Sequence, residues 1–206
     1  MTTQADLVFD PALHRYSMGG RVLPSVTAIL RVAGLVDATW FTDDARERGS
    51  YVHVASQYIA EGDGVDMASI EPELAGYVAA YSTYEAEHHP RWTHIEHPVA
   101  SRVYGYAGTV DRVGVLCGVD AVLDIKTGAR VAATRLQLAA YAQAMREETG
   151  KLYRRYTLYL LANGGYRLED LDREPHLYQL DLNAFLSALT IVRWQEREGE
   201  ACHGSE

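Results

Sequence analysis

A chain of 206 residues with 48% hydrophobic side chains is long enough for one globular domain with a buried core. Its formal net charge of -9 argues against a surface that binds nucleic acid over its whole extent, but leaves room for a local basic groove. Two cysteines are too few for a disulfide framework or a four-cysteine cluster. No apolar run reaches the length of a membrane span and the polar N-terminus lacks signal-peptide features, so we expect a cytoplasmic protein with no membrane partner.

The first part of the chain is predicted to form short strands followed by two helices. Alternating segments between Pro and Gly turns indicate strands at residues 7–10, 14–17 and 21–23. Ser25 is the expected N-cap of a helix that ends at Gly34. A longer helix is expected over residues 42–60, because Asp43 and Asp44 in its first turn would interact favourably with the helix dipole.

One face of the helix at 42–60 carries a polar stripe. Its members are three or four residues apart: Arg46, Gly49, His53 and Gln57. The stripe is thin at Gly49, where a backbone or a ligand could approach. His53 alone is compatible with either a half-buried structural histidine or a ligand.

The middle of the chain is predicted to contain a third helix and two strand-like segments. The helix, over residues 71–87, has an aromatic stripe that we interpret as core rather than as a surface for stacking bases. The strand-like segments cover residues 92–100 and 102–108. Glu96, in the first of them, is either a solvent-facing strand residue or a third acid near the site described next.

A β-hairpin with two acidic residues follows. Its strands, predicted to pair antiparallel around a turn at Gly118, are residues 109–117 and 119–126. A turn centred between residues 117 and 118 places Asp111 opposite Asp124, and opposed residues share a sheet face. The period of two puts Lys126 on the same face as Asp124.

This convergence of two carboxylates and an amine predicts a metal site. Two acids at one point repel each other unless positive charge lies between them, and oxygen ligands suit hard cations such as Mg²⁺ or Mn²⁺. Lysine is rare in this chain: only Lys126 and Lys151 occur among 19 basic residues. We interpret the lysine beside the paired acids as a chemical requirement, because an amine, unlike a guanidinium, can exchange a proton.

The last part of the chain is predicted to contain a helix, two strands and a closing helix. Thr134 is the expected N-cap of the first helix, which Gly150 ends, and Gln137 and Tyr141 lie one turn apart on one face of it. Strands are expected at 153–161 and 166–170, a helix at 183–197 and a disordered tail at 199–206. The order of elements predicts an α/β fold with a central mixed sheet flanked by helices.

The residues resemble the PD-(D/E)xK nuclease superfamily, in particular its RecB-like branch, which includes phage exonucleases. The matching pieces occur in the same order along most of the chain: the Pro24–Leu30 segment, Arg48-Gly49 with His53, the Gly108–Asp111 segment, the Asp124–Gly128 segment, and Gln137 with Tyr141. The resemblance implies a restriction-endonuclease-like core with N-terminal helical elements over the site. It also implies a single nuclease domain over 1–206, with an N-terminal hairpin and helices at 1–90, a catalytic core at 91–198 and the tail.

Carried over residue by residue, the resemblance implies one or two divalent ions. Their ligands would be His53, Asp111, Asp124 and the backbone carbonyl of Ile125, with Glu96 as a further candidate. Two cysteines cannot hold the iron–sulfur cluster that some members carry, so none is expected.

The same resemblance implies roles in catalysis and substrate binding. Lys126 would position or activate water or stabilise charge on phosphorus, and Gln137 and Tyr141 would hold the scissile backbone. Further substrate contacts are expected from Arg48, Gly49, Thr127 and Arg135.

The function that follows is a metal-dependent deoxyribonuclease, an exonuclease in DNA recombination, repair or phage genome processing. Its partners would be DNA and a recombination or annealing protein or a helicase, because the chain contains no Walker-type phosphate loop for a motor of its own. Two alternatives stay open: a nuclease fold that binds DNA or a partner without cutting, and a metal-free protein whose acids are a solvated hairpin edge.

Overall fold

The computed structural model describes residues 6–36, 42–174 and 176–203. Eight strands occur in this part of the chain: β1 (Leu7–Asp10), β2 (Arg15–Met18), β3 (Arg21–Leu23), β4 (Arg91–Ser101), β5 (Tyr106–Leu116), β6 (Val119–Lys126), β7 (Arg154–Leu160) and β8 (Tyr166–Asp170). The helices are α1 (Val26–Val32), α2 (Asp43–Glu61), the 3-10 helix η2 (Met67–Ser69), α3 (Pro72–His88), α4 (Ala133–Thr149) and α5 (Leu177–His203).

The main sheet has five strands in the order β4-β5-β6-β7-β8. All neighbours pair antiparallel except β6 and β7, which pair parallel. Parallel neighbours need a crossover connection, and α4 supplies it between the two strands. The predicted α/β fold, a central mixed sheet flanked by helices, is confirmed.

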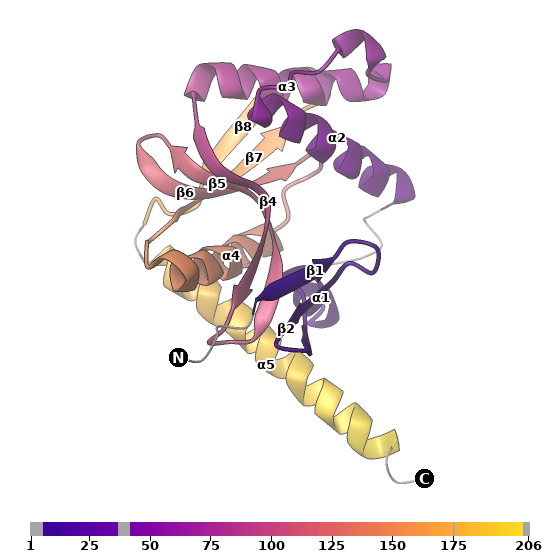
Figure 1. Cartoon of the computed structure of the whole chain (residues 1–206), viewed down its shortest axis with the longest axis vertical. Helices are drawn as coiled ribbons and strands as arrows, with labels where there is room; N and C mark the ends of the chain where they lie inside the picture. The colour runs from indigo at the N-terminus through magenta and orange to yellow at the C-terminus, as the bar shows by residue number, and fades with distance from the viewer. Residues whose placement is uncertain (1–5, 37–41, 175, 204–206) are drawn as a thin grey trace.

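Helices cover both faces of the main sheet and create two hydrophobic cores (Figure 1). On one face α1, α4 and α5 pack against alternate sheet residues that include Val110 and Val122. On the other face α2 and α3 pack against Leu123, Ile125 and Leu158. Because successive strand residues point to opposite faces, Asp124, between Leu123 and Ile125, faces the α4 side.

The N-terminal strands form a separate antiparallel sheet in the order β1-β2-β3, as the sequence predicts. The chain then joins the main sheet directly: Ala107 donates from its N–H to the Pro24 carbonyl, and Ser25 makes an isolated parallel bridge to Ala107. Ser25 also caps α1, since its side chain accepts a hydrogen bond from the Ala28 N–H. This sheet and α1 are thereby fixed to the start of β5.

Residues 102–105 form a turn, so the strand expected at 102–108 is wrong over these four residues, and its last three residues, 106–108, belong to β5. The carboxylate of Glu147 accepts hydrogen bonds from the Ser101 hydroxyl and from the backbone N–H groups of Arg102 and Val103. Gly105 closes the turn with a φ of +65°. The acid from α4 thus provides the partners that a strand neighbour would otherwise provide, and β5 begins at Tyr106.

Two other boundaries differ from expectation. Ala132, not Thr134, occupies the N-cap of α4, and no side chain caps that helix. The last helix is longer than the predicted 183–197 and runs through much of the tail expected to be disordered. Its first turns are held by packing, since Tyr178 lies beneath the guanidinium of the buried Arg155 and Leu182 is buried.

No helix in the described ranges is long and apolar enough to cross a membrane. Residues 1–5, on which the expectation about the N-terminus rests, and residues 204–206 of the expected tail lie outside the described residues.

Candidate active site

The β5–β6 hairpin has the register that the turn at Gly118 predicts. Leu116 pairs with Val119 and, at the far end of the ladder, Arg112 pairs with Leu123. One step further the ladder stops, and Asp111 turns its carboxylate to the next strand, where Oδ2 accepts the Ile125 N–H at 2.7 Å. Asp111 and Asp124 are both buried, at 7% and 1% exposure. The acids therefore meet at the end of β6.

Glu96 approaches the same point because β4 is irregular there. The β4–β5 pairing runs from Ile95 with Arg112 directly to His97 with Val110, so that Glu96 is left out of the ladder opposite Asp111. Glu96 has a φ of +47°, a left-handed conformation that is uncommon for a residue with a side chain. Of the two interpretations of Glu96, a solvent-facing strand residue or a third acid near the site, the structure shows the second.

His53 joins the acids from α2. Its Nδ1 lies 3.3 Å from Glu96 Oε1, and its Nε2 lies 3.2 Å from the Ile125 carbonyl oxygen and 3.8 Å from Asp111 Oδ2. Burial disfavours the charged ring, but the carboxylates of Asp111 and Glu96 outweigh it and raise the pKa of His53 to about 9. An imidazole with acceptors at both nitrogens is a donor at both, so the protonated ring supplies the positive charge between the acids.

Asp124 and Lys126 form the next part of the site, on the face that the strand period predicts. Lys126 Nζ donates to Asp124 Oδ1 at 3.0 Å and lies 2.8 Å from Oδ2. Burial raises the pKa of Asp124 and Lys126 lowers it, with a net rise to about 6. For Lys126, burial works against the charge, but Asp124 and Asp111 prevail and raise its pKa above the ordinary value. At neutral pH the two groups therefore form an ion pair, with a protonated amine and an ionised carboxylate.

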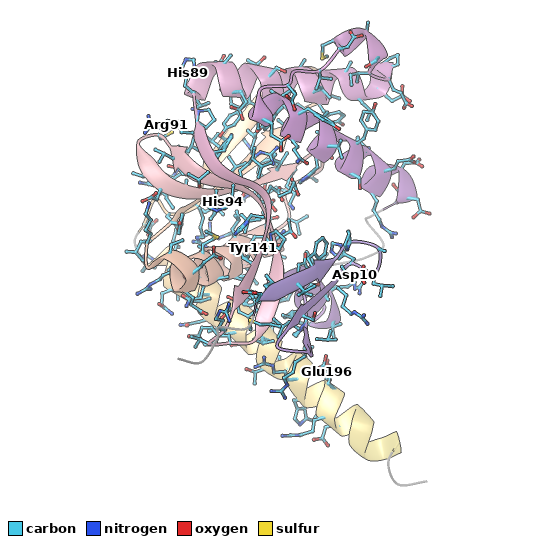
Figure 2. All side chains as sticks on the ribbon, in the orientation of Figure 1. Asp10, His89, Arg91, His94, Tyr141 and Glu196 are labelled. Carbon is cyan, nitrogen blue, oxygen red and sulfur yellow. The ribbon has the colours of Figure 1, made fainter. Side chains whose placement is uncertain are left out.

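Gln137 and Tyr141 bring α4 into contact with the acids. The Gln137 side-chain amide donates to Asp124 Oδ1 at 3.0 Å and to the Tyr141 hydroxyl at 3.3 Å. Tyr141, labelled in Figure 2, lies on α4 with its ring against Gly108 near the start of β5. Gly108 makes this contact possible, because a Cβ there would lie 2.6 Å from Tyr141 Cε1. The glycine before the first acid is thus required by packing against the tyrosine.

A fully buried arginine, Arg112, contacts two of the acids, and the sequence analysis did not identify it. Arg112 is 0% exposed and donates to Glu96 Oε1 at 3.2 Å and to the Asp111 carbonyl oxygen at 2.7 Å. It also donates to the Ser56 hydroxyl at 2.8 Å and to the Tyr81 hydroxyl at 3.1 Å. The signal for it was weak: an arginine inside an otherwise apolar strand, directly after the first acid.

The other predicted substrate residues lie apart from this cluster. Arg48 stacks over the Tyr77 ring, with 5.7 Å from its Cζ to the ring centroid. Gly49 has open space where a Cβ would be. Thr127 follows Lys126 at the end of β6 and is half-buried. Arg135 forms an ion pair with Asp181 at 2.9 Å. The structure brings none of these four into contact with the acids, so their substrate roles stay predictions.

The donor set fits a hard divalent cation. His53, Glu96 and Asp111 each offer one ligand atom, and these three atoms lie within 4.8 Å of one another. Atoms bound to Mg²⁺ at 2.0–2.1 Å are about 3 to 4 Å apart, so small side-chain movements suffice. Asp124 Oδ2 is also buried, with the Lys126 amine at 2.8 Å as its ion-pair partner. The cluster could therefore bind a metal.

Comparison with known proteins gives little further information. No family model matches the chain, and no curated protein matches it in sequence. A solved structure named "Putative exonuclease", from Eubacterium rectale, is 11% identical to this chain. The match covers 79% of this chain and 73% of the other chain, and the two superpose with a TM-score of 0.46. This likeness is too low to carry an argument, so the function is argued from the site.

Proposed function

We propose that this protein is a divalent-metal-dependent deoxyribonuclease of the PD-(D/E)xK superfamily, RecB-like branch, and that it acts as an exonuclease. One observation carries the proposal. Side chains from α2, β4, β5, β6 and α4 converge on one point and supply three carboxylates, an imidazole and a lysine. Each is of the type that hydrolysis of a phosphodiester with a metal requires.

The metal ligands would come from residues that already contact one another. Asp111 and Asp124 would each give a carboxylate oxygen, and Ile125 its backbone carbonyl. His53 now donates to that carbonyl and would instead turn a neutral nitrogen to the ion, giving up a proton. Oxygen-rich donors suit Mg²⁺ and Mn²⁺, and the imidazole makes Mn²⁺ the better first choice.

A divalent cation, when bound here, supplies Lewis-acid stabilisation of the charge that develops on the phosphate. Lys126 places a second positive charge on the same side of the sheet, where it orients water and stabilises the developing charge. Gln137 holds Asp124 and the buried Tyr141 in place by donating a hydrogen bond to each. Arg112 holds both acids in position, because it donates to the Glu96 carboxylate and to the Asp111 carbonyl oxygen.

The experiment uses end-labelled DNA with Mg²⁺ or Mn²⁺, in linear and circular forms and in single- and double-stranded forms. We expect metal-dependent cleavage of linear DNA, loss of cleavage in excess chelator and recovery when metal is restored. Circular DNA left intact means that an end is required, which supports the exonuclease. Binding of DNA without cleavage at any metal concentration would instead support the non-cutting alternative.

A further inference from the structure

A cavity of about 280 Å³ lies one strand away from the acids. In the parallel β6–β7 pairing, Thr157 is the partner of Asp124 and Tyr159 is the partner of Lys126. Paired residues share a face, and neighbouring strands are about 4.8 Å apart. Thr157 and Tyr159 both line the cavity. Its floor therefore continues the sheet face that carries the catalytic pair.

The cavity is walled by the segment that joins the two halves of the site. Residues 130–132, in the connection between Lys126 and α4, form one wall, and Glu169 and Leu171, at the other edge of the sheet, form another. Arg130 and Glu169 make an ion pair at 2.8 Å, with Arg130 largely exposed. The lining thus combines apolar side chains and one aromatic ring with two arginines, Arg130 paired with Glu169 and Arg135 paired with Asp181.

Thr157 is the observation that points to a ligand. The residue is 0% exposed, and its Oγ1 is buried with no hydrogen-bond partner among the described residues. A buried hydroxyl without a partner costs about 1 to 3 kcal/mol, and a valine of the same shape would avoid this cost. The unpaired Thr157 hydroxyl therefore lowers the stability of the protein unless a bound ligand supplies its hydrogen-bond partner.

We propose that this cavity holds the base of the nucleotide next to the scissile phosphate. The inference rests on the proposed function, whose site it extends by a base-binding pocket. A base has apolar faces, which suit Leu171 and the Tyr159 ring, and a polar edge, which suits the Thr157 hydroxyl. A bare phosphate fits less well, because the two lining arginines, Arg130 and Arg135, are already paired with Glu169 and Asp181.

The pocket also predicts a base preference. A carboxylate has about four acceptor positions, so Glu169 can accept from a base amino group while it stays paired with Arg130. Adenine, cytosine and guanine carry an amino group, whereas thymine does not. Thymine at this position should therefore bind least well.

The test measures binding and cleavage separately. Fluorescence anisotropy in EDTA gives the affinity of wild type, Thr157→Val and Glu169→Gln for a short labelled single-stranded oligonucleotide and for a series with one abasic residue at each position in turn. Thr83→Val is the matched control, because the Thr83 hydroxyl donates to the Ala79 carbonyl on the exposed side of α3, away from the site. Thermal unfolding is recorded for every variant.

We expect wild type to lose about tenfold in affinity when the base is removed at one position, and little elsewhere. Thr157→Val should show a smaller loss at that position with an unchanged or higher Tm, and Glu169→Gln should bind thymine there as well as the other bases. Thr83→Val should bind like wild type.

A uniform abasic profile overturns the pocket, as does a Thr157→Val protein that binds like wild type or unfolds at lower temperature. If wild type cleaves DNA but its abasic profile is uniform, the nuclease function is retained and the base-binding pocket is rejected. If affinity falls at a single abasic position but the protein never cleaves DNA, the pocket is retained and the nuclease function is rejected. A protein that neither binds nor cleaves DNA rejects both.

Discussion

Replacing the buried Arg112 tests whether the acids are held by a cation built into the fold. Arg112→Met keeps much of the apolar stem and removes the guanidinium with its four partners, Glu96, the Asp111 carbonyl, Ser56 and Tyr81. Breaking a buried charge pair by removing one member costs about 3 to 5 kcal/mol.

The partners of Arg112 decide where in that range the cost lies. Glu96 keeps His53 at 3.3 Å, the Ser56 hydroxyl still donates to the His53 carbonyl, and the Tyr81 hydroxyl still donates to Glu85. No side chain is left without a partner, so we expect the lower value, about 3 kcal/mol. For a domain of this size, that lowers Tm by about 6–12 °C.

Thermal unfolding followed by circular dichroism in EDTA measures the effect without any metal. The control is Arg197→Met, because the Arg197 side chain is 72% exposed and its contact with Glu198 is at the surface. We expect the control to change Tm by less than about 2 °C. An Arg112→Met protein that unfolds within this margin of wild type would refute the reasoning, since its four contacts would then contribute nothing.

Two other predictions concern the metal and the packing of the site. Mn²⁺ at about 100 times its Kd should stabilise wild type by about 2.7 kcal/mol, or roughly 5–11 °C in Tm. His53→Gln should lose most of this gain, as measured by thermal unfolding. An equal gain in both proteins would show that His53 is not a metal ligand. Gly108→Ala should reduce the cleavage rate about 10- to 100-fold, because its Cβ would lie 2.6 Å from the Tyr141 ring. The control Gly199→Ala, where an added Cβ meets no other atom within 4 Å, should cleave like wild type. Equal rates for the two variants would show that the position of the tyrosine does not matter for cleavage.

Local sequence rules predicted the parts of the site that depend on one hairpin or one helix. The turn at Gly118 gives the register from Leu116 with Val119 to Arg112 with Leu123. The strand period then places Lys126 beside Asp124, and helical spacing places Gln137 next to Tyr141.

The rest depended on contacts that local rules do not contain. The position of Glu96 follows from a strand irregularity with a φ of +47°, and a regular alternation would not have shown it. Arg112 would be assigned to the solvent face of an isolated hairpin, whereas α2 and α3 cover that face with Ser56 and Tyr81. Thr157 reaches the site only through the parallel pairing of β6 and β7, whose register the sequence of either strand does not specify.

The two lysines of the chain allow the most direct test of the central claim. Lys126 is paired with the buried Asp124, whereas Lys151 pairs with Asp120 at the surface. The measurement is the rate at which Lys126→Met and Lys151→Met proteins cleave linear DNA with Mn²⁺. We predict that Lys126→Met loses at least about 100-fold in rate, as removal of one charge-stabilising group does, and that Lys151→Met cleaves like wild type. Equal rates for the two variants would contradict the assignment of this site as the catalytic centre.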